Sequence, residues 1–282
     1  MKLGRYPSLA FPHMRLEYMN KRFFAFGCSY TRYDYLTWAD LIGANFDEHY
    51  NYGCSGASNT YIMNRVVEAD KKFNFTDSDQ VMVMLTGIGR VSYLHKDDPN
   101  NSATRWNTQG DLKPYYGHTK DPRAKYLLDH IWCEDGLVYQ SWIASNVIKS
   151  TLVSKCIPHT ILMGIDNSDF LNPSKDLSYK ACKLVKEIYD IVDNKQSIDE
   201  WRLLNSDNYD SPFWIDINRN DGHPSTKAYL RYVSDHFPQF LTEKTMDLFN
   251  LGEKLFVHTS QVEQGSKFVN DFKFNSSKNP LF

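Results

Sequence analysis

The chain has 282 residues and a formal net charge of -2, with 32 Lys and Arg against 34 Asp and Glu. This balance argues against a general nucleic-acid binder, which normally carries a strong basic excess. The length suffices for one large α/β domain or two small ones with a substantial core. Aromatic residues make up 15% of the chain, and such rings fill a core or stack on sugars and flat apolar ligands.

In chain order, an apolar strand is expected at 22–28, then a helix at 37–46, a strand at 49–54, a helix at 58–73 and a strand at 80–87. The second half continues with a helix at 137–155, a strand at 159–166, a helix at 178–192, a strand at 213–218 and a helix at 225–249. We expect N-caps at Ser58 and Ser225 and a break at Pro238. Strands alternating with helices predict a mostly parallel sheet with helices on both faces, a three-layer α/β/α fold.

Residues 89–135 interrupt this alternation, because they are polar, rich in Asn and Asp and punctuated by Pro and Gly. A segment of this length without periodicity is typical of a functional insertion or a flexible loop. The domain organisation predicted from these patterns is an N-terminal extension at 1–21, one domain at 22–246 that contains the insertion, and a C-terminal tail at 247–282.

Cysteine usage and the N-terminus bear on location. The five cysteines are odd in number and include no C-x-x-C pair, so a reducing compartment is the simpler interpretation. Cys28 and Cys54 end two strands expected to be neighbours, and buried thiols are favoured there over a disulfide. The N-terminus has no continuous apolar segment, and no later stretch is long enough to span a membrane. We therefore expect a cytoplasmic protein without membrane or nucleic-acid partners.

Small and hydroxyl residues follow most of the expected strands, and ligands bind beyond the carboxyl ends of strands in such sheets. Ser29, in "FAFGCSYT", is either a nucleophile close to free backbone N–H groups or only the residue that ends a strand. His223 in "NRNDGHPS" precedes a helix N-cap and is a candidate base. Either Asp221 or Asn220 could orient its imidazole, and Asp221 would also stabilise the imidazolium.

The segment "NYGCSGASN" at 51–59 supplies a third element of a site. Its two glycines allow close backbone approach and leave the Gly56 N–H free to donate. A plain strand-to-helix turn is the alternative interpretation. A phosphate-cradling loop is disfavoured, because the segment has neither the G-x-G-x-x-G spacing nor a Walker lysine.

Taken together, G-x-S-x-T, then N-x-G-x-S-G, then D-x-H-P before a C-terminal helix resemble the motifs of the SGNH (GDSL-type) hydrolases, in that family's order. The resemblance covers roughly residues 22 to 240. It implies a flavodoxin-like, mostly parallel five-stranded sheet and a serine hydrolase that needs no metal or organic cofactor. It also implies that Ser29 is the nucleophile, that Gly56 and Ser29 supply backbone oxyanion donors, and that His223 is the general base.

The sequence departs from the family pattern at three positions. Cys28 replaces the acidic residue before the nucleophile, which is not catalytic in the family. Asn220 occupies the usual position of the orienting acid, and we favour Asp221 for that role. Ile88 stands where the family has an oxyanion-donating Asn, and losing one such donor costs about 3 kcal/mol of transition-state stabilisation. Arg90 and Asn59 are the candidate replacements, and Arg90 could instead bind an acidic group of the substrate or form a surface ion pair.

These observations predict a serine esterase that hydrolyses a small acyl ester, with O-acetyl favoured. The polar, aromatic insertion favours a carbohydrate ester over a long acyl chain. An O-acyltransferase with the same nucleophile and a non-catalytic, SGNH-like glycan- or protein-binding domain are the alternatives. A flavodoxin-like nucleotide binder is disfavoured by the missing phosphate-loop spacing.

Overall fold

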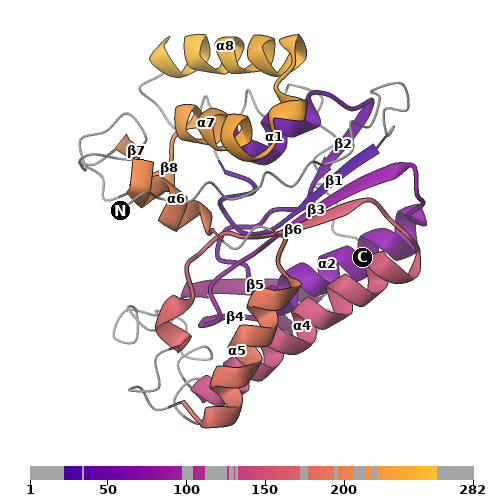
Figure 1. Cartoon of the computed structure of the whole chain (residues 1–282), viewed down its shortest axis with the longest axis vertical. Coiled ribbons are helices and arrows are strands. Elements are labelled where there is room, and N and C mark those ends of the chain that lie inside the picture. The colour runs from indigo at the N-terminus through magenta and orange to yellow at the C-terminus, as the bar shows by residue number, and fades with distance from the viewer. Residues whose placement is uncertain are drawn as a thin grey trace, which may run out of the picture.

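The computed structural model describes residues 22–33, 35–96, 104–111, 126, 130, 133–171, 177–193, 196–205, 214–216 and 221–258. The chain has an α/β fold in which a parallel sheet lies between two layers of helices (Figure 1). This architecture confirms the three-layer α/β/α fold expected from the alternation of strands and helices. No helix in the described ranges is both long enough and apolar enough to cross a membrane.

The main sheet has the strand order β2-β1-β3-β6, and every pair of neighbours is parallel. Its strands are β1 (Arg22–Phe26), β2 (Glu48–Asn51), β3 (Asp79–Leu85) and β6 (His159–Met163). The central strands β1 and β3 are almost continuously apolar and buried, because helices cover both of their faces.

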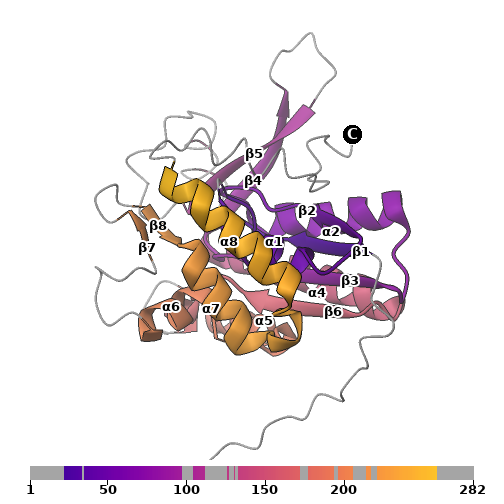
Figure 2. The ribbon, with the colours of Figure 1, turned by 90° about the horizontal axis from the view of Figure 1, so that it is seen from above.

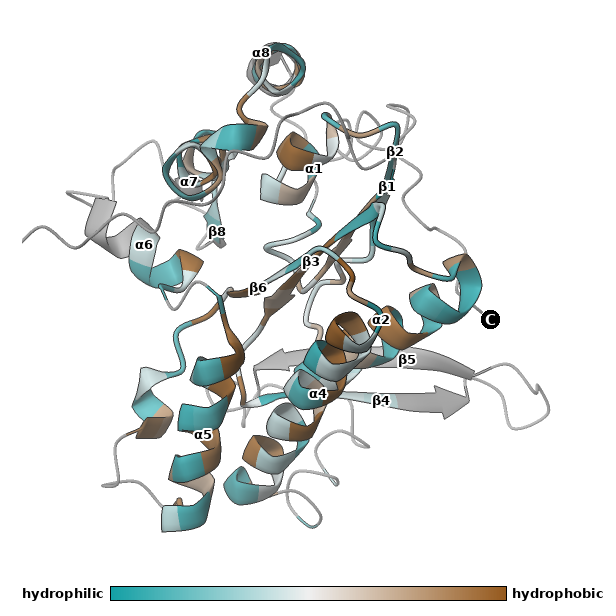
Figure 3. Cartoon of the chain, turned by 45° about the vertical axis from the view of Figure 1, so that its right-hand side comes forward, coloured by the Kyte–Doolittle hydropathy of each residue, from teal (hydrophilic) through white to brown (hydrophobic). Residues whose placement is uncertain are grey.

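Helices α1 (Trp38–Gly43) and α7 (Thr226–His236) lie on one face of the sheet, with α6 (Ile198–Asn205) beside α7 and α8 (Glu243–His258) on the outer side of α1 and α7. Helices α2 (Asn59–Phe73), α4 (Glu134–Ser154) and α5 (Tyr179–Ile191) cover the other face. Apolar stripes on α2, α4 and α5 turn toward the core (Figure 3). The helix caps expected at Ser58 and Ser225 are confirmed, because each hydroxyl accepts a backbone N–H three residues later.

The last long helical segment is divided as the sequence predicts. Helix α7 ends at His236, a short 3-10 helix follows at Pro238–Phe240, and α8 begins at Glu243. The boundary placed between residues 246 and 247 falls inside α8, where Leu248 is buried against Leu36. Residues 247–258 therefore belong to the folded body.

The segment expected to form a fifth strand of the main sheet belongs to another sheet. Within 213–218 the structure has only the short strand β7 (Trp214–Asp216), which pairs antiparallel with β8 (Asp221–Pro224) in a separate two-stranded sheet. The described part of the main sheet thus has four strands rather than five. β8 begins only five positions after β7 ends, a separation too short for the crossover that a parallel partner needs, so the two strands pair antiparallel.

The insertion at 89–135 contains a second antiparallel pair, β4 (Arg90–Lys96) and β5 (Thr104–Asp111), which the sequence did not predict. This hairpin projects from the body of the molecule (Figure 2). Its base is held by Val91, which is buried and packs against Tyr93 and Leu137. Apart from residues 126, 130 and 133–135, the remainder of the insertion lies outside the described residues.

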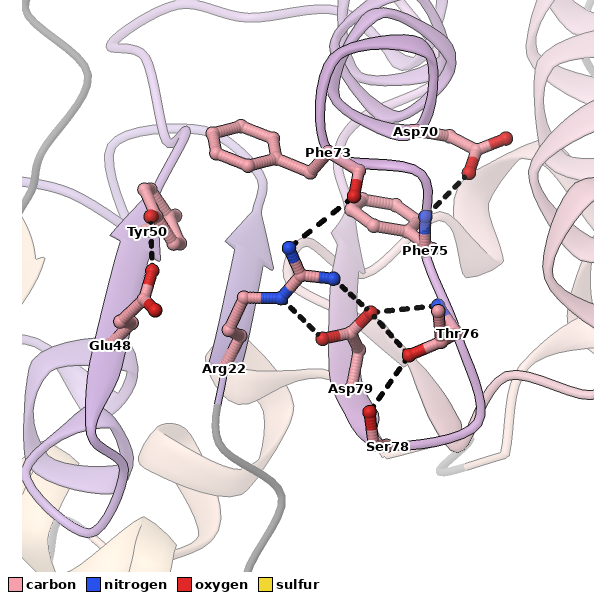
Figure 4. A network of polar contacts seen from close by, with 9 residues as sticks. All are labelled: Arg22, Glu48, Tyr50, Asp70, Phe73, Phe75, Thr76, Ser78 and Asp79. Carbon is pink, nitrogen blue, oxygen red and sulfur yellow. Dashed lines mark hydrogen bonds and ion pairs between the residues drawn. The ribbon is translucent and has the colours of Figure 1, made fainter.

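Paired charges close the amino edge of the sheet (Figure 4). Arg22, at the start of β1, donates from Nε and Nη2 to the two carboxylate oxygens of Asp79, at the start of β3, each over 2.7 Å. Asp79 Oδ2 also accepts the backbone N–H of Thr76 at 2.7 Å, and Arg22 Nη1 donates to the Phe73 carbonyl at 3.3 Å. Pairing with Asp79 raises the pKa of Arg22, so the charge is fixed.

Candidate active site

The strand order reverses between β1 and β3, since β1 connects to β2 on one side and β3 connects to β6 on the other. In open α/β sheets, a ligand crevice forms at such a switch point, outside the carboxyl ends of the two strands. Ser29 follows β1 and Arg90 follows β3, so the topology places these two candidates on either side of the same crevice.

Ser29 lies in a tight turn that directly follows β1. The backbone N–H groups of Thr31 and Arg32 both donate to the Cys28 carbonyl, at 3.0 and 3.2 Å. A Cβ at Gly27 would lie 2.0 Å from Thr31 Oγ1, so the turn requires glycine there. Helix α1 starts later and is capped by Thr37. Ser29 therefore caps no helix among the described elements, and the turn presents it at the carboxyl edge of the sheet.

The loop after β2 packs directly on the Ser29 turn. The Cys54 N–H donates to the Gly27 carbonyl at 3.1 Å, and Asn51 Nδ2 donates to the Thr31 carbonyl at 2.8 Å. A Cβ at Gly53 would lie 2.6 Å from the Arg32 backbone nitrogen, so only glycine permits this approach. These contacts bring the first two sequence motifs together, as the order of the motifs led us to expect.

Two backbone donors remain without partners beside this contact. Gly56 has a φ of 72°, the left-handed conformation that glycine adopts at little cost. Within the described ranges, neither the Gly56 N–H nor the Ser29 N–H donates a hydrogen bond. Preorganised N–H groups of this kind can stabilise a developing oxyanion.

A buried polar network holds the turn and the loop in place. The Asp40 carboxylate accepts hydrogen bonds from the Thr37 N–H at 2.8 Å and from Asn51 Nδ2 at 3.2 Å, and Thr37 Oγ1 donates to the Thr31 carbonyl at 2.6 Å. Burial raises the pKa of Asp40, and the hydrogen bonds from Thr37 and Asn51 oppose that rise. The network gives the turn the rigid support that a catalytic geometry needs.

His223 reaches the same place from the far end of the chain. Its imidazole stacks on the Tyr33 ring, with centroids 4.0 Å apart and an interplanar angle of 19°, and meets the Tyr30 ring edge-on at 5.4 Å. The Tyr35 hydroxyl donates to the Pro224 carbonyl at 3.1 Å, which fastens the segment after the Ser29 turn to β8. The structure thus places His223 against the turn that carries Ser29.

The hydrogen bonds of the described residues do not include one between Ser29 Oγ and the His223 imidazole. Catalytic hydrogen bonds often tighten only when substrate binds, so the absence of this hydrogen bond is compatible with a nucleophile and its base. Asp221 is the first residue of β8, and its side chain, like the whole of Asn220, lies outside the described residues.

The segment after β3 holds Ile88 and Asn59 in structural positions. The Ile88 side chain is buried, and its N–H donates to Asn167 Oδ1 at 2.8 Å. The Asn59 amide accepts the Thr86 N–H at 2.8 Å and donates to the Thr86 carbonyl and Ser141 Oγ. Because both sides of the Asn59 amide are engaged, we do not include Asn59 among the oxyanion donors.

Arg90 has the opposite character. Its Nε and Nη1 atoms are buried and have no hydrogen-bond partner among the described residues. The residue as a whole is only partly buried. Arg90 is therefore a cationic donor whose capacity the described protein groups leave unused.

Sequence reasoning missed the aromatic surroundings of His223. Tyr30 and Tyr33 both contact the imidazole, and the Tyr30 hydroxyl donates to Asp199 Oδ1 on α6 at 2.6 Å. The only signal in the sequence is the spacing of these tyrosines directly after Ser29, which a core or surface role would explain equally well.

The described residues include no group of three or more His, Cys, Asp or Glu side chains that could hold a metal ion. All five cysteines are free thiols.

Neither a scan against protein-family models nor a search of curated proteins gave a match. Among solved structures, the chain is similar to a member of the lipolytic protein G-D-S-L family from Veillonella parvula DSM 2008. The TM-score is 0.40 and the identity 13%, over 77% of this chain and 98% of that chain. The proposals below rest on the geometry of this chain's own residues.

Proposed function

We propose that the chain is a serine esterase that removes a small acyl group, with acetyl favoured, from a hydroxyl of a carbohydrate. The observation that carries this proposal is the juxtaposition, at the carboxyl edge of the sheet, of the Ser29 turn, the His223 imidazole and two N–H groups without a partner among the described residues. A serine that only ends a strand would need neither the two N–H groups nor the imidazole beside it.

In the proposed reaction, Ser29 Oγ attacks the ester carbonyl carbon while the His223 imidazole accepts the hydroxyl proton. The Ser29 and Gly56 N–H groups donate to the resulting oxyanion. Collapse of the tetrahedral intermediate breaks the bond to the alcohol, which leaves with the proton from His223. A water then repeats the sequence and releases the acid. We assign Asp221 the role of orienting the imidazole and stabilising its protonated form.

Burial of Ser29 supports a small acyl group. The residue is only 3% exposed, and so sheltered a hydroxyl favours a small acyl group over a long chain. A carbohydrate alcohol is supported by the polar and aromatic composition of the 89–135 insertion. Without an Asn in place of Ile88, the oxyanion has two backbone donors, and the expected turnover is correspondingly modest.

The test is labelling with a fluorophosphonate probe together with hydrolysis of 4-nitrophenyl acetate. Wild type should react with both, whereas Ser29→Ala should lose labelling and turnover and His223→Ala should lose turnover. Ser78→Ala, which removes an exposed hydroxyl at the opposite edge of the sheet, is the matched control and should behave as wild type. Absence of labelling and turnover in wild type, or labelling that persists in Ser29→Ala, would overturn the proposal and favour a non-catalytic binding domain.

The low exposure of Ser29 also favours a second candidate, an O-acyltransferase. A sheltered acyl-enzyme reacts slowly with water and can wait for a sugar hydroxyl. Adding a sugar acceptor to the acetate assay separates the two activities. With an esterase, the acetic acid released per ester cleaved does not change when the acceptor is added. With a transferase, this yield falls because acetyl groups are transferred to the acceptor.

A further inference from the structure

Arg90, like Arg32, forms no ion pair with a described carboxylate, in contrast to three other arginines. Arg22 is paired with Asp79, Arg65 with Glu68 and Arg231 with Asp235. Arg90 has no carboxylate partner among the described residues, although two of its guanidinium nitrogens are buried. In the hairpin register Arg90 lies opposite Asp111, whose side chain lies outside the described residues. Leaving a buried charge without a partner is costly, so a cation in this state favours an anion beside it, from a ligand or from that residue.

Arg90 lies close to the carboxyl end of β3. It is the first residue of β4, its N–H donates to the Gly87 carbonyl at 3.1 Å, and it directly follows the turn that leaves β3. That turn is anchored from the β6 side, because Asn167 accepts the Ile88 N–H. On the β1 side, a Cβ at Gly27 would lie 3.2 Å from the Met84 carbonyl oxygen, so the Ser29 turn and the end of β3 are in contact.

We propose that Arg90 binds a permanent anionic group of the substrate, so that the ester cleaved at Ser29 belongs to an acid-bearing molecule. This inference rests on the proposed esterase function and narrows its substrate class. A guanidinium presents its N–H groups in a planar fork that matches carboxylate, sulfonate and phosphate oxygens. The transient oxyanion does not need Arg90, because the proposed esterase mechanism assigns it to the Ser29 and Gly56 N–H groups.

The kinetic test uses acetyl esters that differ only in charge. These are 4-acetoxybenzoate, 4-acetoxybenzenesulfonate and 4-acetoxyphenyl phosphate, with 4-acetoxybenzamide as the neutral reference. In wild type, kcat/KM should be higher for at least one anionic ester than for the amide. In Arg90→Met the ratio of anionic to neutral kcat/KM should fall by about tenfold or more, the loss expected when a charge-assisted hydrogen bond is removed. Arg90→Lys, which keeps the charge but not the fork, should lose part of the ratio.

The control is Arg231→Met, which removes an exposed arginine on α7 and should leave the ratio as in wild type. Equal losses for the anionic and neutral esters in Arg90→Met would make Arg90 an oxyanion donor and overturn the proposal. A ratio that Arg90→Met does not change would overturn it as well. Urea unfolding of Arg90→Met checks the fold, and its midpoint should not fall, because the substitution removes an unpaired buried charge.

A binding measurement separates this proposal from the esterase proposal. Calorimetric titration uses 4-hydroxybenzoate, 4-hydroxybenzenesulfonate and 4-hydroxyphenyl phosphate, with 4-hydroxybenzamide as the neutral reference. Binding of an anion that is lost in Arg90→Met supports the anion site even if no ester is hydrolysed. Hydrolysis of the neutral ester without any Arg90-dependent anion binding supports the esterase alone. The preferred anion identifies which oxyacid the site selects.

Discussion

The two edges of the main sheet differ in whether particular polar groups have hydrogen-bond partners. At the amino edge, the Arg22 guanidinium and the Asp79 carboxylate satisfy each other, and Thr76 takes up the remaining capacity of the carboxylate. At the carboxyl edge, the Ser29 and Gly56 N–H groups and the Arg90 guanidinium have no partner among the described residues. Because a buried charged group without a partner is costly, the two buried nitrogens of Arg90 favour a binding site at the carboxyl edge.

The largest effect is expected at the carboxyl edge. His223→Gln keeps a polar side chain of similar size but removes the base, so ester turnover should fall by about 10² to 10⁴-fold. The urea midpoint should change little, because His223 is only partly buried. The measurement is kcat/KM on 4-nitrophenyl acetate beside an unfolding curve. Wild-type turnover in His223→Gln would contradict the catalytic role proposed for the carboxyl edge.

The amino edge should respond in stability rather than in activity. Asp79→Ala leaves the Arg22 guanidinium and the Thr76 N–H without their acceptor, and the free energy of unfolding should fall by about 3 kcal/mol. Urea unfolding measures this loss, and kcat/KM measured well below the new midpoint should stay at the wild-type value. A selective loss of turnover in a stably folded Asp79→Ala would show that the two edges are not separable.

A pH effect is also expected from the β2 side of the amino edge. Burial lowers the pKa of His49 to about 3. On acidification the imidazole therefore takes up a proton near pH 6.5 in the unfolded chain but only near pH 3 in the folded chain. The stability that His49 contributes is therefore present above pH 6.5 and is lost as the pH falls toward 3. At pH 5 the loss amounts to about 2 kcal/mol.

Urea unfolding at pH 7.5 and pH 5.0 checks this prediction in wild type and His49→Phe. The phenyl ring can keep the contact with Phe23 but cannot titrate, so the variant should lose less stability between the two pH values. His236, whose pKa is also lowered by burial, contributes in the same direction to both proteins. An equal loss in both proteins would contradict the role given to His49.

The smallest effect concerns the ring that positions His223. Tyr33→Leu removes a stacked aromatic contact of about 0.5–1.5 kcal/mol, and kcat should fall by about 2- to 10-fold. Tyr33→Phe keeps the ring and should retain activity, which separates stacking from the hydroxyl. The pH profile of kcat should shift in Tyr33→Leu, because the environment of the imidazole changes, whereas a purely structural role would leave it in place.

Local patterns predicted most of the scaffold. A few consecutive residues are enough to determine the apolar strands β1 and β3, the caps at Ser58 and Ser225 and the break at Pro238. The same reasoning missed the β4–β5 hairpin and assigned β7 to the wrong sheet. Strand partners are chosen by contacts between distant segments, and a short apolar run such as "FWIDIN" does not specify which neighbour it will find.

The candidate site divides in the same way. The sequence by itself determined which residues are candidates for the site, because Ser29, Gly56 and His223 stand in motifs with recognisable order and spacing. Only the tertiary structure decided that the Asn59 amide is hydrogen-bonded to Thr86 and Ser141 and that His223 stacks on Tyr33. It also decided that two guanidinium nitrogens of Arg90 are buried without a hydrogen-bond partner among the described residues. A motif fixes which groups are present, whereas hydrogen-bond partners and burial depend on what the rest of the chain brings beside them.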